Sequence, residues 1–158
     1  MTWAEDLLVE LVAASTEEAG QAVMARAFGE IGLEPVDVCL DADALRADPH
    51  SSPFSWDVSG KRNVVASWKG RGGGRSLILN GHIDVVPPAN EELWTSPPFA
   101  PRVDGDWIYG RGAGDMKAGL AAMTSAIRTL REQGVDLAGD VHLQSVVEEE
   151  CTGNGTLQ

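Results

Sequence analysis

Two apolar segments of this 158-residue chain end in side chains of the types that bind metals. Leu77–Leu79 leads into Asn80–Asp84 (NGHID), and Val141–Val147 leads into Glu148–Glu150. Short apolar runs are typical of buried strands, and α/β sheets place their sites at the carboxyl ends of strands. Imidazole nitrogen together with carboxylate oxygen suits zinc-like divalent cations. These segments therefore predict a sheet with a metal site at one end.

Helical patterns lie between the predicted strands. Thr2 and Glu5 form a capping box before an apolar stripe, and Ser15–Glu18 repeats the capping-box pattern before a second helix. A third helical pattern covers residues 117–133, and the largely apolar Val141–Val147 reads as a central strand. The mixture of strands and helices predicts an α/β fold.

Turn residues organise the remaining segments. Val36–Leu40 alternates like a strand, whereas the polar, proline-containing residues 41–60 predict a surface excursion rather than a domain boundary. Asn63–Trp68 and Ser76–Asn80 flank the cluster Gly70–Gly74, which favours a hairpin with a glycine-rich turn.

Composition narrows the function classes. The formal net charge of −12, from 24 acidic and 12 basic residues, argues against nucleic acid or an anionic membrane as a partner. Cys39 and Cys151 give no disulfide framework and no cysteine zinc site. The N-terminus lacks a signal-peptide pattern, and no apolar run approaches the roughly 18 residues that span a membrane. We therefore expect a cytoplasmic or equivalent reducing location.

A glycine-rich segment, Gly110–Lys117 (GRGAGDMK), follows a short predicted strand at Trp107–Tyr109. Its glycines permit a tight turn that brings Asp115 inward, where the two carboxylate oxygens can bridge two metals. The alternative is an ordinary turn in which Asp115 caps the following helix, and the motif taken alone favours that reading. The spacing matches neither the dinucleotide nor the Walker pattern.

The charged strand ends also allow two interpretations. His82 can bind metal while Asp84 orients its imidazole, although a structural hydrogen bond explains most His-x-Asp pairs. Adjacent glutamates usually form a solvated face or a helix start. At the end of a buried strand, however, their mutual repulsion favours nearby cations, with one glutamate binding metal and its neighbour accepting a proton from water.

Three stretches in this order resemble the N-terminal motifs of the M20 metallopeptidases: Asn80–Pro87 (NGHIDVVP), Gly110–Gly119 (GRGAGDMKAG) and Glu148–Glu150. That group includes acetylornithine deacetylases, succinyl-diaminopimelate desuccinylases, aminoacylases and carboxypeptidases. The resemblance runs from the first helix to Gln158. It implies a three-layer α/β zinc-hydrolase catalytic domain with a mixed sheet, and a small N-acyl amino acid or peptide as substrate.

The resemblance also implies a role for each matching residue. His82 would bind one zinc ion, Asp115 would bridge two zinc ions, and Glu150 would bind a single metal. Glu149 would be the general base, and Asp84 would support His82. Cobalt is an expected substitute for zinc. The peptide bond between Asp115 and Met116 would be cis.

The resemblance implies a longer protein than this chain. Members continue into a further metal ligand, a dimerisation (lid) domain and a late histidine ligand, and neither His50 nor His142 matches these. We therefore expect residues 1–158 to be the N-terminal part of the catalytic domain, incomplete at its C-terminus, inactive alone and homodimeric when full-length. The alternatives are a dipeptidase or carboxypeptidase of the same family, and an inactive metal-binding remnant.

Overall fold

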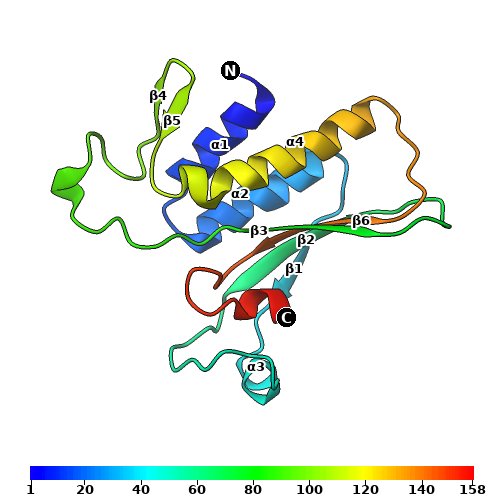
Figure 1. The fold of residues 1–158 in the computed structure, drawn as a ribbon, viewed down its shortest axis with the longest axis horizontal. Helices are drawn as coiled ribbons and strands as arrows, with labels where there is room; N and C mark the ends of the chain where they lie inside the picture. Colours follow the sequence, from blue (N-terminus) through cyan, green and yellow to red (C-terminus); the bar gives the residue numbers. More distant parts are fainter.

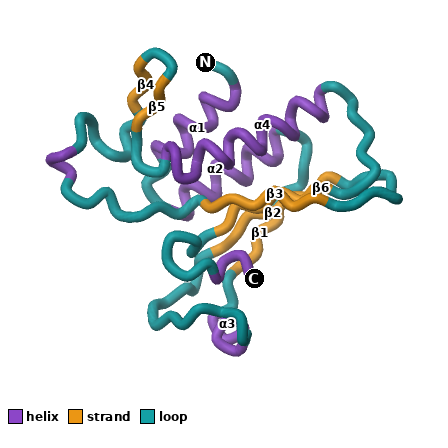
Figure 2. The backbone as a smooth tube through the Cα atoms, viewed as in Figure 1, coloured by secondary structure: helices purple, strands orange, loops and turns teal.

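The computed structural model describes residues 1–158 as four helices, six strands and three short turns of helix (Figures 1 and 2). The helices are α1 (Trp3–Ala13), α2 (Glu17–Glu30), α3 (Ala42–Ala47) and α4 (Ala118–Glu132). The strands are β1 (Val36–Cys39), β2 (Arg62–Trp68), β3 (Leu77–His82), β4 (Arg102–Asp104), β5 (Trp107–Tyr109) and β6 (Val141–Val146). Short helical turns cover Glu91–Leu93, Ala113–Lys117 and Asn154–Leu157.

The main sheet is mixed, as predicted, with strand order β1-β2-β6-β3. Strand β6 is central; it runs antiparallel to β2 and parallel to β3. Helices α1, α2 and α4 lie on one side of this sheet, whereas α3 and the C-terminal turn lie on the other (Figure 1). The core between helices and sheet is apolar, and its fully buried members include Leu11, Phe28, Leu120 and Leu143.

The predicted hairpin between β2 and β3 is wrong. The two strands do not pair, because β6 lies between them and bonds to both. The glycine-rich segment that joins them bonds instead to the chain leading into β6: Arg71 N–H donates to the Leu137 carbonyl at 2.8 Å, and Gly74 N–H to the Ala138 carbonyl at 3.0 Å. In its central position the apolar strand β6 is paired along both edges. Local turn residues, on which the hairpin prediction depended, carry no information about this pairing.

Local signals set the helix ends. The Thr2–Glu5 capping box forms, and the Thr16 hydroxyl accepts the Ala19 N–H at 3.1 Å at the start of α2. The predicted surface excursion contains a helix, α3, that the sequence analysis missed. Asp41 caps the first turn of this helix. The sequence did not predict the helix because Asp41 lies in a short acidic stretch whose residues are typical of turns.

A separate two-stranded ribbon, β4 with β5, stands beyond the main sheet near the N-terminus (Figure 1). It leads directly into the turn that carries Asp115, so it fixes the entry to that turn. None of the helices has the length and apolar character that crossing a bilayer demands.

Candidate metal centre

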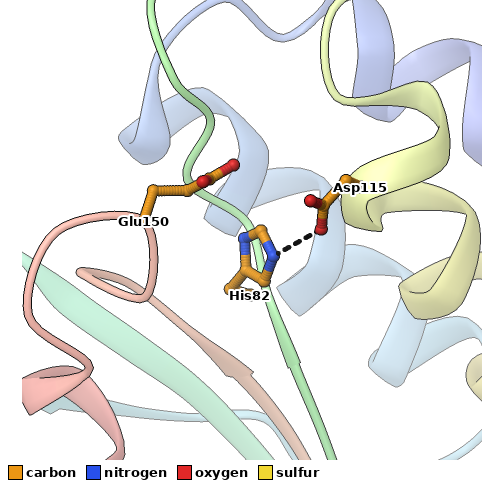
Figure 3. Close-up of side chains that lie close together, drawn as sticks. All are labelled: His82, Asp115 and Glu150. Atoms are coloured by element: carbon orange, nitrogen blue, oxygen red, sulfur yellow. Dashed lines mark hydrogen bonds and ion pairs between the residues drawn. The ribbon is translucent and has the colours of Figure 1, made fainter.

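His82 occupies the last position of β3 and is almost fully buried. Its Nδ1 lies 2.9 Å from the backbone carbonyl oxygen of Asp84. Since a carbonyl can only accept, this contact places the proton of the neutral ring on Nδ1 and leaves the Nε2 lone pair free. Nε2 points at Asp115, whose Oδ1 is 3.1 Å away (Figure 3).

Asp115 reaches this position from the turn between β5 and α4. Gly112 has a φ of 77°, and a Cβ there would lie 2.4 Å from a methyl carbon of Val85, so this position requires glycine. Gly114 has neither constraint. The Asp115–Met116 peptide bond is cis, as the resemblance implies. The alternative interpretation, in which Asp115 caps the following helix, does not hold, because its side chain makes no capping hydrogen bond. The side chain is 82% exposed.

Glu149 and Glu150 follow β6, the strand beside β3. Glu149 Oε2 lies 3.6 Å from His82 Nε2, and one carboxylate oxygen of Glu150 approaches the same cluster. Single ligand atoms of His82, Asp115 and Glu150 all lie within 4.8 Å of one another. Three segments far apart in sequence thus converge at the carboxyl ends of adjacent strands, as predicted (Figure 3).

The donor set fits a divalent cation. An unprotonated Nε2 and a carboxylate oxygen are both acceptors, so their 3.1 Å separation requires a positive charge on or between them. A zinc-like ion or a proton can supply it. Burial acts to lower the pKa of His82, but hydrogen bonds to the Asp84 carbonyl and Asp115, with the charges of Asp84 and Glu149, raise it above its ordinary value.

Asp84 joins two parts of the site in a way the sequence did not predict. Its carbonyl, rather than its carboxylate, makes the close contact with the imidazole, since Oδ1 is 3.6 Å from Nδ1. Its Oδ2 accepts the backbone N–H of Glu150 at 3.0 Å. Oδ1 is buried without a hydrogen-bond partner. Asp84 therefore links His82, through its own backbone carbonyl, to the Glu150 backbone, through its carboxylate.

Glu148 does not belong to this cluster. Its side chain is buried and bonds to the Lys61 ammonium and to Trp56 Nε1, the latter at 3.0 Å. Sequence reasoning missed both partners, because they fall in or beside the polar excursion. The available signal was Glu148 itself, since a glutamate directly after a buried strand needs a partner.

The sequence analysis also did not predict that Lys117 is a buried charged residue. It is 2% exposed, and its Nζ donates to the Ala14 carbonyl at 3.0 Å. Burial lowers its pKa to about 8. The bond ties the turn that carries Asp115 to the end of α1, so it helps to fix the position of the aspartate.

Comparison with solved structures shows the fold. A di-peptidase of Saccharomyces cerevisiae is 16% identical with a TM-score of 0.70, over 94% of this chain and 32% of that chain. An M20 family metallo-carboxypeptidase of Sulfolobus solfataricus is 23% identical with a TM-score of 0.68, over 95% of this chain and 32% of that chain.

Sequence comparison adds closer relatives. An N-formyl-4-amino-5-aminomethyl-2-methylpyrimidine deformylase of Bacillus subtilis (strain 168) is 43% identical over 106 residues, 65% of this chain and 25% of that protein. A succinyl-diaminopimelate desuccinylase of Buchnera aphidicola is 41% identical over 92 residues, 58% of this chain and 24% of that protein. The chain thus spans about a quarter of the length of these curated relatives.

The family model for peptidase family M20/M25/M40 matches residues 78–158. That match takes in β3 from its second residue onward, the Asp115 turn and the glutamates after β6, the three segments that build the cluster. The chain belongs to peptidase family M20/M25/M40.

Proposed function

We propose that the protein is a di-zinc amidohydrolase that cleaves the amide bond of an N-acyl amino acid or a similar N-acyl amine. His82, Asp115 and Glu150 would hold the metal, and Asp115 would offer its carboxylate to both ions. The observation that carries the proposal is the convergence of these three ligand types within 4.8 Å, from segments that lie far apart in the sequence. Family membership supports it.

The residues divide the chemistry between them. When bound, the metal ions supply polarisation of the amide carbonyl and a lowered pKa of water. Glu149, half exposed and 3.6 Å from His82 Nε2, accepts the proton from water and returns it to the leaving amine. Asp84 holds His82 in the tautomer that binds metal and holds the Glu150 backbone in place.

The relatives narrow the substrate class. One is a deformylase and another a desuccinylase, and both match this chain at similar identity. A panel of N-formyl, N-acetyl and N-succinyl amines, with and without added zinc or cobalt, therefore tests the acyl group directly. Dipeptides in the same panel test the peptidase alternative. Metal binding without any turnover by the longest polypeptide that the gene encodes would favour the inactive remnant.

Two neighbouring glutamates provide the sharpest test. In that longest polypeptide, Glu149→Gln removes the proton acceptor, so hydrolysis falls by about 10²–10⁴ while bound zinc stays near normal. Glu150→Gln removes a ligand, so zinc content and activity fall together. Both are measured by metal analysis of the purified variants and by turnover of the best panel substrate. Full activity in both variants would show that the assigned roles are wrong.

A further inference from the structure

Glu148 is a buried carboxylate that the metal cluster does not use. It is 2% exposed, and its φ of 68° lies in the left-handed region that non-glycine residues rarely adopt. Its carbonyl oxygen accepts the N–H groups of Thr152 and Gly153 at 3.0 and 2.8 Å, which closes a tight turn. Such a conformation persists only where surrounding contacts hold it.

Two contacts hold this side chain, and one of its partners makes a further contact. One Glu148 oxygen bonds to Lys61 Nζ, the other to Trp56 Nε1, and Lys61 also bonds to Glu17 Oε1 at 3.0 Å. Burial acts to lower the pKa of Lys61, but its bonds to Glu148 and Glu17 raise it overall, so the ammonium stays charged. The turn after β6 is thereby attached to the start of α2 and to the loop before β2.

The turn is fixed from its other side by the metal centre. The residue two positions on, Glu150, donates its N–H to Asp84 Oδ2 at 3.0 Å, and Glu149 lies 3.6 Å from His82 Nε2. Glu148 therefore anchors one end of a short segment whose next two side chains face the cluster. A shift of about 1 Å in such a segment is large on the scale of zinc–ligand bonds of roughly 2.0–2.2 Å.

We propose that Lys61 and Trp56 are positioning residues that act through Glu148 to aim Glu149 and Glu150 at the metal. This inference rests on the proposed function, because it assigns the two residues to the same site. Neither forms a hydrogen bond to His82, Asp115 or Glu150. If this clamp, formed by the bonds of Lys61 and Trp56 to Glu148, only stabilised the fold, its loss would lower the melting temperature without changing the metal environment. The two roles are therefore separable.

The chain offers a matched control in Lys69. Lys61 immediately precedes β2 and Lys69 immediately follows it, and Lys69 also forms a carboxylate pair, with Asp140 at 2.8 Å. The test variants are Lys61→Met, which removes the ammonium, and Lys61→Arg, which restores a charge. Trp56→Phe removes one hydrogen-bond donor and leaves the ion pair, so it remains informative if Lys61→Met fails to fold. Lys69→Met is the control.

Two measurements, made on the parent chain and on each variant, decide the outcome. Cobalt titration followed by visible absorption gives affinity and ligand geometry, and hydrogen exchange of residues 147–153 gives the local order of the turn. We expect Lys61→Met to weaken cobalt binding by roughly 10–100-fold, the range typical of lost outer-shell partners, and to alter the cobalt spectrum. Trp56→Phe should show a smaller effect of the same kind. Lys61→Arg should recover most of the affinity, and Lys69→Met should match the parent.

Faster exchange with parental cobalt affinity and spectrum in the folded variants would overturn the proposal, because the clamp would then be structural only. Unchanged exchange and unchanged cobalt binding would overturn it as well. A failure of the proposed function looks different. In that case the parent chain itself binds cobalt no better than the His82→Ala variant, and both inferences fall together.

Discussion

Charged and ionisable side chains are buried at one end of the central strands and more exposed at the other. At the carboxyl end of β3 and β6, His82, Asp84 and Glu148 are each at most 5% exposed, and each bonds to a residue of another segment. At the opposite end, the pair of Lys69 with Asp140 has side chains 71% and 29% exposed.

The contrast has an energetic meaning. Exposed ion pairs contribute about 0–1 kcal/mol, so the far end is an ordinary solvated surface. Burying charged groups costs several kcal/mol per ion unless partners compensate, so a fold retains them where they serve a purpose. The difference between the ends singles out the same end of the sheet as the candidate metal centre, independently of the family match.

The largest expected effect is on cobalt affinity, in a comparison of two histidines on neighbouring strands. His82→Ala removes a ligand, so cobalt affinity should fall more than 100-fold, beyond the roughly 10–100-fold typical of an outer-shell loss. His142 lies on β6 and its side chain bonds to the Ser67 hydroxyl, at 2.8 Å, so His142→Ala should bind cobalt like the parent. Equal losses in both variants, measured by calorimetric or spectroscopic titration, would mean that the cluster is not the binding site.

A smaller effect on metal affinity is expected in a comparison of two aspartates. Asp84→Asn replaces the acceptor of the Glu150 N–H and removes a buried charge beside His82, so metal affinity should fall about 10–100-fold. Asp140→Asn alters an acceptor of the Gly70 N–H and a surface ion pair, and it should leave affinity unchanged. The same titration checks both. Parental affinity in Asp84→Asn would remove its assigned role in linking the two segments.

The smallest effect concerns pH in the metal-free chain. The pKa of His82 is raised in the folded state, so the folded chain binds this proton more tightly than the unfolded chain. That stabilisation is complete below the ordinary pKa of about 6.5 and is lost as pH rises through the raised value. The melting temperature should therefore contain a component that declines across this window.

Two observations would isolate that component. It should disappear in His82→Gln and persist in His142→Gln, when melting is followed by circular dichroism across the same pH series. Zinc affinity should change in the opposite direction and increase with pH, because the metal replaces the proton on Nε2. A pH dependence identical in all three chains would show that His82 does not titrate in this window.

Much of the fold follows from local patterns. The Thr2–Glu5 capping box, the helix that precedes Gly134 and the central apolar strand need only near-neighbour chemistry, and all three form. The hairpin prediction failed because strand pairing is decided by long-range burial. Helix α3 was missed because its cap, Asp41, lies in a stretch whose composition is typical of loops.

For the site, the sequence by itself determined the residue types. His82, Asp115 and Glu150 are recognisable from their motifs, and parallel pairing of two strands that end in polar residues makes their meeting expected. Only the tertiary structure decided how each residue is held. The Asp84 carbonyl makes the contact with the imidazole that the strand spacing predicted for the Asp84 side chain, and the Lys61–Glu148 pair joins residues 87 positions apart without any local signature. Their positions follow from packing, because a buried charge selects whichever partner the fold brings within reach.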